Sequence, residues 1–202
     1  PSSAGGIAAY ARTREYHKVV KDMLHKMLSR LGLDTAGGAQ NKICCDTVPI
    51  SDKHWAARAG LGFIGRHTLL VTPKWGTWVN LGEIVTTEEC DTYSTPMEED
   101  GCVGCGRCLL RCPTGAILTN RTLNATLCIS NKTVEQGPGE WDDTHGWFFG
   151  CEECQSCCPH NATSPLHTNP RFDALYDPRH YDSNFWAKVS RTEAESLFAN
   201  TP

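Results

Sequence analysis

The sequence predicts an α+β fold in which a region of mixed helices and strands precedes a region rich in cysteine. Three observations support this expectation. Apolar residues recur at helical spacing from Tyr16 to Leu31, and short apolar runs bounded by glycine or proline continue to about residue 87. Nine of the twelve cysteines then lie beyond residue 100. A helical period followed by strand-like runs indicates mixed secondary structure, and clustered cysteines indicate a second part that depends on metal.

The first predicted element is an amphipathic helix. Gly32 follows its last apolar residue and is suited to end it. The other face carries the bases Lys18, Lys21, Lys26 and Arg30, which is typical of a solvated surface. The apolar positions follow the three–four spacing of a helix and are Tyr16, Val19, Val20, Met23, Leu24, Met27, Leu28 and Leu31.

A strand and a second helix are predicted next. The run 43–48 is apolar except for Asp46 and is closed by Pro49, so we expect a strand whose end presents an acid. Ser51 is suited to cap a helix over residues 52–59. Further strands are expected at 69–72, 78–81 and 83–86.

Residues 60–65 match the dinucleotide-binding pattern G-x-G-x-x-G letter by letter. That pattern requires a strand immediately before it, whereas a helix is predicted here, so we exclude a dinucleotide site. We expect Gly62 and Gly65 to permit a tight turn and a close backbone approach. Arg66 and His67, which follow the last glycine, are candidate anion contacts.

The cysteines are the most informative feature of the chain. Cys102, Cys105, Cys108 and Cys112 read C-x-x-C-x-x-C-x-x-x-C-P, the run of bacterial ferredoxins. Three thiolates at this interval bind one iron–sulfur cube, and the fourth ligates a different cube. A second group at 151–158 again ends in Cys-Pro. The region therefore predicts a ferredoxin-like module with two [4Fe–4S] clusters, and a function in moving single electrons.

The cysteines can be divided between two cubes. Cys128 completes the second set, because Cys157 is adjacent to Cys158 and would compete for one direction in space. The first cube is expected to use Cys102, Cys105, Cys108 and Cys158, and the second Cys112, Cys128, Cys151 and Cys154. We interpret the unassigned Cys44, Cys45, Cys90 and Cys157 as small buried side chains.

Two other uses of the cysteines are disfavoured. A four-cysteine zinc site is built from two separated pairs and has no use for a third cysteine at the same interval. A disulfide scaffold spreads its cysteines over the loops that it staples, whereas these cysteines cluster and no secretory leader precedes them.

Composition sets the remaining expectations. The 202 residues carry a formal net charge of −4, which gives no sign of a nucleic-acid or membrane partner. No apolar run is long enough to span a bilayer. Reduced thiols predict a cytoplasmic protein. We expect one region at 1–87, the cluster module at 88–165, and a polar tail at 166–202 in which Trp186 and Phe198 are candidate anchors. Within the module, residues 116–118 and 129–135 are expected to be helical.

Several segments together resemble one known family. They cover roughly residues 5–165 in order, and are 10–12, 16–17, 45–49, 59–68, 81–83, 102–116, 128–130 and 150–161. In these segments the chain is similar to the epoxyqueuosine reductases. The resemblance implies that the N-terminal part of the family is missing here. The implied fold is a partial cobalamin-binding α/β domain followed by the ferredoxin-like module with two [4Fe–4S] clusters.

The resemblance also implies a reaction. Members of the family reduce epoxyqueuosine to queuosine in tRNA, with electrons passing from an external low-potential donor through the clusters to cobalamin. By the family pattern Asp46 is the proton donor to the oxygen that leaves the epoxide. We expect Ser130, Gly62, Gly65 and Arg66 to bind the cofactor. Two alternatives are a related corrinoid reductase, such as one like the reductive dehalogenases, and a ferredoxin-type electron carrier.

Overall fold

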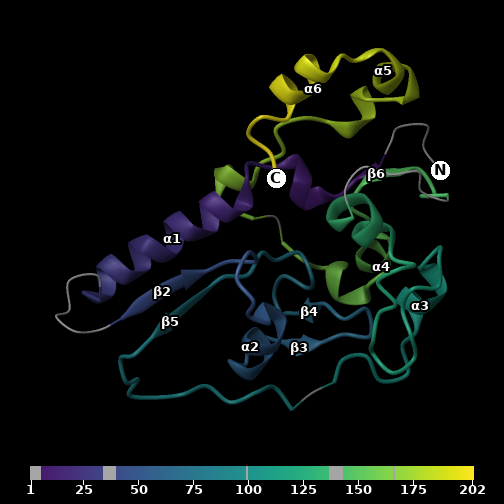
Figure 1. Ribbon diagram of the computed structural model, residues 1–202. Coiled ribbons are helices and arrows are strands. Elements are labelled where there is room, and N and C mark those ends of the chain that lie inside the picture. The colour runs from purple at the N-terminus through teal and green to yellow at the C-terminus, as the bar shows by residue number, and fades with distance from the viewer. Residues whose placement is uncertain (1–5, 34–39, 99, 137–142, 166) are drawn as a thin grey trace.

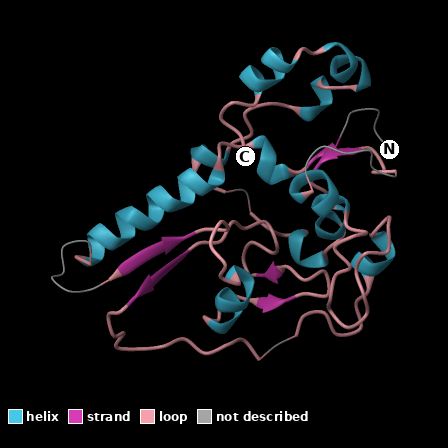
Figure 2. Cartoon of the chain, in the orientation of Figure 1, coloured by secondary structure: helices cyan, strands magenta, loops and turns pink. Residues whose placement is uncertain are grey.

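The computed structural model describes residues 6–33, 40–98, 100–136, 143–165 and 167–202 (Figure 1). Helices and strands are interspersed along these residues, as Figure 2 shows, which confirms a mixed helical and sheet fold. The described strands form three separate two-stranded sheets. A single parallel sheet of the α/β kind is therefore not what these residues build.

The predicted first helix is confirmed as α1, Tyr16–Leu31. Glu15 caps its start, because its carboxylate accepts hydrogen bonds from the backbone N–H groups of His17 and Lys18. Gly32 ends the helix with a φ of 68°, a left-handed conformation that glycine adopts without steric cost. Val19, Val20 and Leu28 are buried on the face toward β2.

Strand β2, Asn41–Cys44, pairs antiparallel with β5, Glu83–Thr86. The prediction of a strand at 83–86 is confirmed, but the strand expected at 43–48 ends at Cys44. The cause is Asp46, whose φ of 56° lies in the left-handed region and stops the extended backbone. Helix α2, Asp52–Arg58, is also confirmed, although the Ser51 side chain forms no capping hydrogen bond.

A short hairpin follows α2. It consists of β3, Phe63–Ile64, and β4, Leu70–Val71, which lies within the predicted strand 69–72. The strand expected at 78–81 is wrong. Its neighbour Thr77 instead bonds to the cluster module, since Thr77 N–H donates to Asn161 (2.7 Å) and its carbonyl accepts from Gln155 (3.1 Å). The segment therefore docks on that module and joins no sheet among the described residues.

The cluster module contains α3, Arg107–Arg111, α4, Glu153–Ser156, the π-helical turn Asn131–Glu135, and β6, Trp147–Phe149. The expected helix at 129–135 is confirmed. The expected helix at 116–118 is wrong, because Ile117 forms an antiparallel bridge with Leu123 that needs extended backbone. Further single helical turns lie at Ala9–Arg12, Pro159–Asn161, Pro170–Phe172 and Pro178–His180.

The tail is more ordered than its sequence indicates. It forms α5, Ser183–Lys188, and α6, Arg191–Leu197. Trp186 and Phe198 stack with ring centroids 5.7 Å apart, which confirms them as anchors. The rings that surround this pair are Tyr176, Tyr181, Phe185 and, from β6, Phe148.

The beginning of the chain contacts both later parts. Strand β1, Gly6–Ile7, pairs parallel with β6 of the cluster module. The tail donates a hydrogen bond from Leu175 N–H to the Arg12 carbonyl (2.7 Å) and accepts one from Glu15 N–H at the Asn200 carbonyl (2.8 Å). Figure 1 shows the C-terminus beside the start of α1. The boundaries at 87 and 165 stay a prediction, and hydrogen bonds cross both. Among the described helices, none has the length and apolarity to cross a membrane.

Candidate active site and cluster ligands

Asp46 lies in the loop between β2 and α2 and points its carboxylate outward. Its side chain is 63 % exposed. The Tyr16 hydroxyl donates to its Oδ2 at 3.0 Å, and Nε2 of His17 lies 3.1 Å from the same oxygen. Its backbone N–H donates to the Asp52 carboxylate at 3.1 Å. Three neighbours thus fix an acid whose outer face remains open, which suits a proton donor to a ligand.

The negative charge of Asp46 contributes to raised pKa values of two nearby tyrosines, Tyr16 and Tyr10. Burial raises the pKa of Tyr16, and the Asp46 carboxylate raises it further. Burial raises the pKa of Tyr10 to about 12, with the charges of Glu135 and Asp46 adding to the effect. Both phenols therefore stay protonated near neutral pH and act as hydrogen-bond donors.

His17 connects Asp46 to a second acid. Its Nδ1 hydrogen bonds to the Glu15 carboxylate, while its Nε2 faces Asp46. Helical periodicity assigned Tyr16 to the apolar face of α1, and residues 16–17 entered the sequence analysis otherwise only as a segment of the family resemblance. A usable signal existed: residues 15–17 begin the helix, and the first turn is where side chains reach past the helix end.

Glu83, the first residue of β5, is half-buried, and both of its carboxylate oxygens lie out of contact with solvent beside the Asp52 carboxylate. Burial raises the pKa of Glu83 to about 7, and the neighbouring Asp52 carboxylate adds to the rise. The sequence identified Glu83 only as part of a strand.

The four cysteines predicted for the first cube surround one cavity. Arg66, His67, Arg107 and His160 complete its wall, together with Cys102, Cys105, Cys108 and Cys158. Burial raises the pKa of Cys108 to about 11, and nearby thiolates add to it, first that of Cys157 and then that of Cys102. The set fits a cube, which takes one thiolate at each iron corner.

The four cysteines predicted for the second cube are also neighbours. Burial raises the pKa of Cys151 to about 11, and the charges of Cys128 and Cys112 raise it further. Burial likewise raises the pKa of Cys154, and the charges that add to it come from Cys151, Cys108, Cys112 and Cys128. Cys108 belongs to the first set, so the two sets adjoin.

Neither set of cysteines converges on a single point. Among the residues that the structure describes, no three His, Cys, Asp or Glu side chains are arranged to hold a single metal ion. All twelve cysteines are described, and none forms a disulfide.

Cys112 is prepared to be a thiolate. Although burial raises its pKa, the Thr114 hydroxyl and the backbone N–H groups of Ala116, Thr114 and Ile117 lower it more, and the net shift is downward. Hydrogen-bond donors of the residues after Pro113 therefore surround the Cys112 sulfur. Such donors stabilise negative charge on a cluster ligand.

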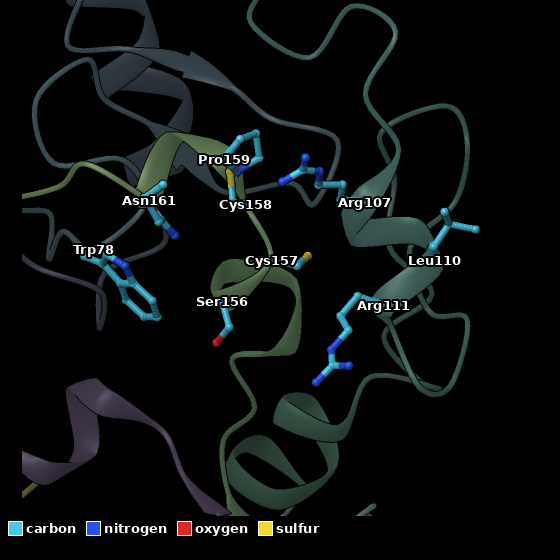
Figure 3. Close-up of a pocket in the computed structure, with 10 residues that line it drawn as sticks. Trp78, Arg107, Leu110, Arg111, Ser156, Cys157, Cys158, Pro159 and Asn161 are labelled. Carbon is cyan, nitrogen blue, oxygen red and sulfur yellow. The ribbon is translucent and has the colours of Figure 1, made fainter. Parts of the chain in front are cut away.

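The interpretation of the four unassigned cysteines as small buried side chains is correct for two of them. Cys44 and Cys45 are fully buried, but Cys90 is exposed and Cys157 is half-buried. Figure 3 shows the sulfurs of Cys157 and Cys158 pointing in different directions. Cys158 lines both the first cavity and a neighbouring open pocket, whereas Cys157 lines the open pocket, with Arg107 and Arg111, and not the first cavity. The choice of Cys158 over Cys157 agrees with this placement.

The residues expected to bind the cofactor fall in two places. Ser130 lies beside Cys128, where the helical turn begins. Gly62 and Gly65 lie at the β3–β4 hairpin, where an added Cβ would meet the Val71 carbonyl at 2.1 Å and the His67 ring at 2.6 Å. Arg66 lines the first cavity. Close approach within the chain thus accounts for both glycines, and their contact with a cofactor stays a prediction.

Contacts of the Tyr10 ring connect the Asp46 site with the second cysteine set. The Tyr10 ring packs edge-on against Tyr16 (6.0 Å) and also contacts Phe149 (6.3 Å). Gly150, which precedes Cys151, lies against Tyr10, so an added Cβ would come within 3.5 Å of that ring. Tyr10 therefore lies between the Tyr16–Asp46 pair and the backbone beside a predicted cluster ligand.

Comparison with known proteins identifies the family. A family model described as "Epoxyqueuosine reductase QueG, DUF1730" matches residues 1–47, and one described as "4Fe-4S double cluster binding domain" matches 101–161. The epoxyqueuosine reductase of Gloeobacter violaceus is 39 % identical over 160 residues, which are 77 % of this chain and 49 % of that protein. The chain belongs to the epoxyqueuosine reductase family.

Other epoxyqueuosine reductases agree with this assignment. That of Cyclobacterium marinum is 35 % identical over 196 residues, 95 % of this chain and 62 % of that protein. The crystal structure of an epoxyqueuosine reductase with a tRNA-Tyr epoxyqueuosine-modified stem loop superposes with a TM-score of 0.86 at 29 % identity, covering 98 % of this chain and 52 % of that one. The chain thus spans about half to three-fifths of the length of these family members.

Proposed function

We propose that this chain carries the proton-donating site and both clusters of an epoxyqueuosine reductase, which converts epoxyqueuosine in tRNA to queuosine. One observation supports this most: an exposed Asp46 carboxylate, held by Tyr16 and His17, is connected through Tyr16 and Tyr10 to the backbone beside Cys151, a member of the second of two adjoining cysteine sets. A solved relative of the same fold is bound to an epoxyqueuosine-modified stem loop.

The overall reaction requires two electrons and two protons, and the epoxide oxygen leaves as water. An alkoxide is a poor leaving group, so an acid in reach of the oxygen lowers the barrier. Asp46 supplies this proton. Tyr16 and His17 both bind Oδ2, which leaves Oδ1 free of these two partners to face the substrate.

His17 returns the proton to Asp46. Its Nε2 faces the acid and its Nδ1 faces the Glu15 carboxylate, so a proton on the ring has an acceptor on each side. Glu15 is fixed in turn by the N–H groups of His17 and Lys18. The three side chains form a chain through which Asp46 regains its proton after each turnover.

Two clusters held by the cysteine sets would supply electrons to a cobalamin bound beside them. Cys102, Cys105, Cys108 and Cys158 hold the first cube, and Cys112, Cys128, Cys151 and Cys154 the second. When bound, cobalamin supplies electrons to the substrate carbon from a metal macrocycle. Ser130 and the Asp46 loop lie on the side of the second cube and are the residues we assign to the cobalamin site. An external low-potential donor reduces the cubes.

The alternative functions share the clusters but differ in the site. A ferredoxin-type carrier has no use for an acid oriented by a tyrosine and a histidine, so the Asp46 site disfavours it. A reductive dehalogenase-like enzyme would need the clusters and cobalamin but another substrate, and only a substrate assay separates the two reductases.

The test is an anaerobic reconstitution of the chain with iron, sulfide and cobalamin, followed by an assay on epoxyqueuosine-containing tRNA. Asp46→Asn keeps the size and removes the acid, and we expect turnover to fall by about 10²–10⁴-fold with both cubes retained. Asp91→Asn, at an exposed position away from the site, serves as the control for loss of a carboxylate. Full turnover by Asp46→Asn would remove Asp46 from the mechanism, and an unaltered chain that binds no iron would refute the proposed function.

A further inference from the structure

His67 buries a nitrogen that lacks a hydrogen-bond partner. The residue is only 4 % exposed, and its Nε2 has no acceptor among the described residues. Its Nδ1 accepts a hydrogen bond from the Leu69 backbone N–H at 3.2 Å. A ring nitrogen that accepts carries no proton, so the hydrogen of the ring is on Nε2. His67 therefore presents a buried N–H donor, and leaving such a donor unpaired costs free energy.

The β3–β4 turn is shaped to hold the ring in this place. Gly65 N–H donates to the Leu69 carbonyl (2.9 Å), and Thr68 adopts a left-handed φ of 67°. The ring lies against Gly65 so closely that a Cβ there would be 2.6 Å from its Cε1 atom. Strained backbone of this kind persists only where the surroundings fix it, and it is common near functional groups.

The ring faces the first cluster site. His67 lines the same cavity as Cys102, Cys105, Cys108 and Cys158. Thiolates and sulfides are acceptors, and inside a buried site a donor to a charged acceptor forms a strong bond. The thiolate sulfurs that line the cavity, and the sulfides of a cube held by them, are therefore acceptors suited to the unpaired N–H.

We propose that Nε2–H of His67 donates a hydrogen bond to a sulfur of the first cube and raises the reduction potential of that cube. The inference rests on the proposed function, which places a cube in this cavity. Reduction adds an electron whose charge spreads over the sulfurs, so a donor stabilises the reduced state more than the oxidised state. The first cube then accepts electrons more readily than it would in a cavity lined only by apolar side chains.

His160 provides a matched control, because it lines the same cavity but has its N–H in use. Its Nε2 hydrogen bonds to the Gly101 carbonyl at 3.2 Å, and its ring packs edge-on against Phe63. Replacing either histidine by phenylalanine keeps an aromatic ring in the wall. Only His67→Phe removes a donor that is free to reach the cluster.

The experiment is a redox titration of the reconstituted chain, followed by electron paramagnetic resonance. We expect His67→Phe to shift the midpoint potential of the first cube to more negative values, with the second cube unchanged as an internal reference. His160→Phe is expected to leave both potentials in place, and His67→Gln, which keeps a donor, to recover part of the shift. An unchanged potential in His67→Phe with both cubes present overturns the inference.

A second measurement covers the case in which His67→Phe fails to assemble its cubes. The otherwise unaltered chain, labelled with ¹⁵N-histidine, is reduced and examined for a nitrogen coupling to the electron spin of the first cube. We expect a coupling that persists in His160→Phe. Its absence overturns the inference while the cubes remain, whereas a chain without iron overturns the proposed function itself.

Discussion

The hydroxyl of Tyr16 donates a 3.0 Å hydrogen bond to Oδ2 of Asp46, across the junction between the start of α1 and the end of β2. Thirty residues separate the two positions, and the relation depends on the close packing of α1 against β2. It assigns Tyr16 the task of holding the acid in one orientation, which leads to a first prediction.

Tyr16→Phe removes this hydrogen bond and keeps the ring. A hydrogen bond to a charged group contributes about 1.5–3 kcal/mol, so we expect turnover to fall by roughly tenfold to a hundredfold. Iron content and cluster spectra should not change. Steady-state kinetics on epoxyqueuosine-containing tRNA give kcat and KM separately and measure the effect. A variant with full kcat would contradict an orienting role for Tyr16.

Adjacent cysteines should behave differently. Both cysteines line the open pocket, but Cys158 also lines the first cavity and Cys157 does not. We expect Cys158→Ser to lower the iron content from about eight to about four atoms per chain, and Cys157→Ser to leave it near eight. Iron and sulfide analysis with absorption spectra checks this. The reverse result would mean that Cys157 completes the first cube.

Glu83 makes stability depend on pH. Its pKa is raised from 4.5 to about 7 in the folded chain, by burial first and by the charge of Asp52 second. The folded state therefore binds more protons than the unfolded state between these values, and the free energy of unfolding falls as pH rises from about 4.5 to about 7. We expect Glu83→Gln to flatten this dependence.

Thermal or urea unfolding at pH 5 and pH 7 measures the effect. Glu89, in the exposed segment after β5, provides the control Glu89→Gln. Equal pH slopes for the unaltered chain and Glu83→Gln would show that the Glu83 carboxyl is not protonated in the folded state.

The aromatic cluster of the tail should help to position the start of α1, which carries Tyr16 and His17. Phe198 contacts the rings of Tyr176, Tyr181 and Trp186. Phe198→Ala removes the contacts of this ring with all three neighbours, and we expect it to destabilise the tail by about 1–3 kcal/mol, less than for a fully buried ring. Hydrogen exchange should rise across residues 167–202 and at Glu15, whose N–H bonds to Asn200.

Leu197→Ala, at an exposed neighbour, is the control for Phe198→Ala. Protection at Glu15 that survives Phe198→Ala would mean that the tail does not position the start of α1.

Local sequence patterns predicted those helices and strands that are determined by residues close together in the chain. The spacing of Val19, Val20 and Leu28 defined α1, and Gly32 ended it, because helical periodicity and left-handed glycine are local properties. The strand at 78–81 failed for the opposite reason. The hydrogen bonds of Thr77 go to Gln155 and Asn161, about eighty positions away, and no local pattern contains them.

By itself the sequence predicted the two sets of four cysteines, with Cys158 preferred over Cys157, because spacing along the chain limits which thiolates can share a cube. Its motifs also indicated the family and, through the family, Asp46. Only the tertiary structure decided that Tyr16 and His17 contact Asp46, and that His67 lines the first cavity with an unpaired Nε2. The physical reason is that hydrogen bonds and burial depend on distances in space, which packing sets between residues far apart in the chain.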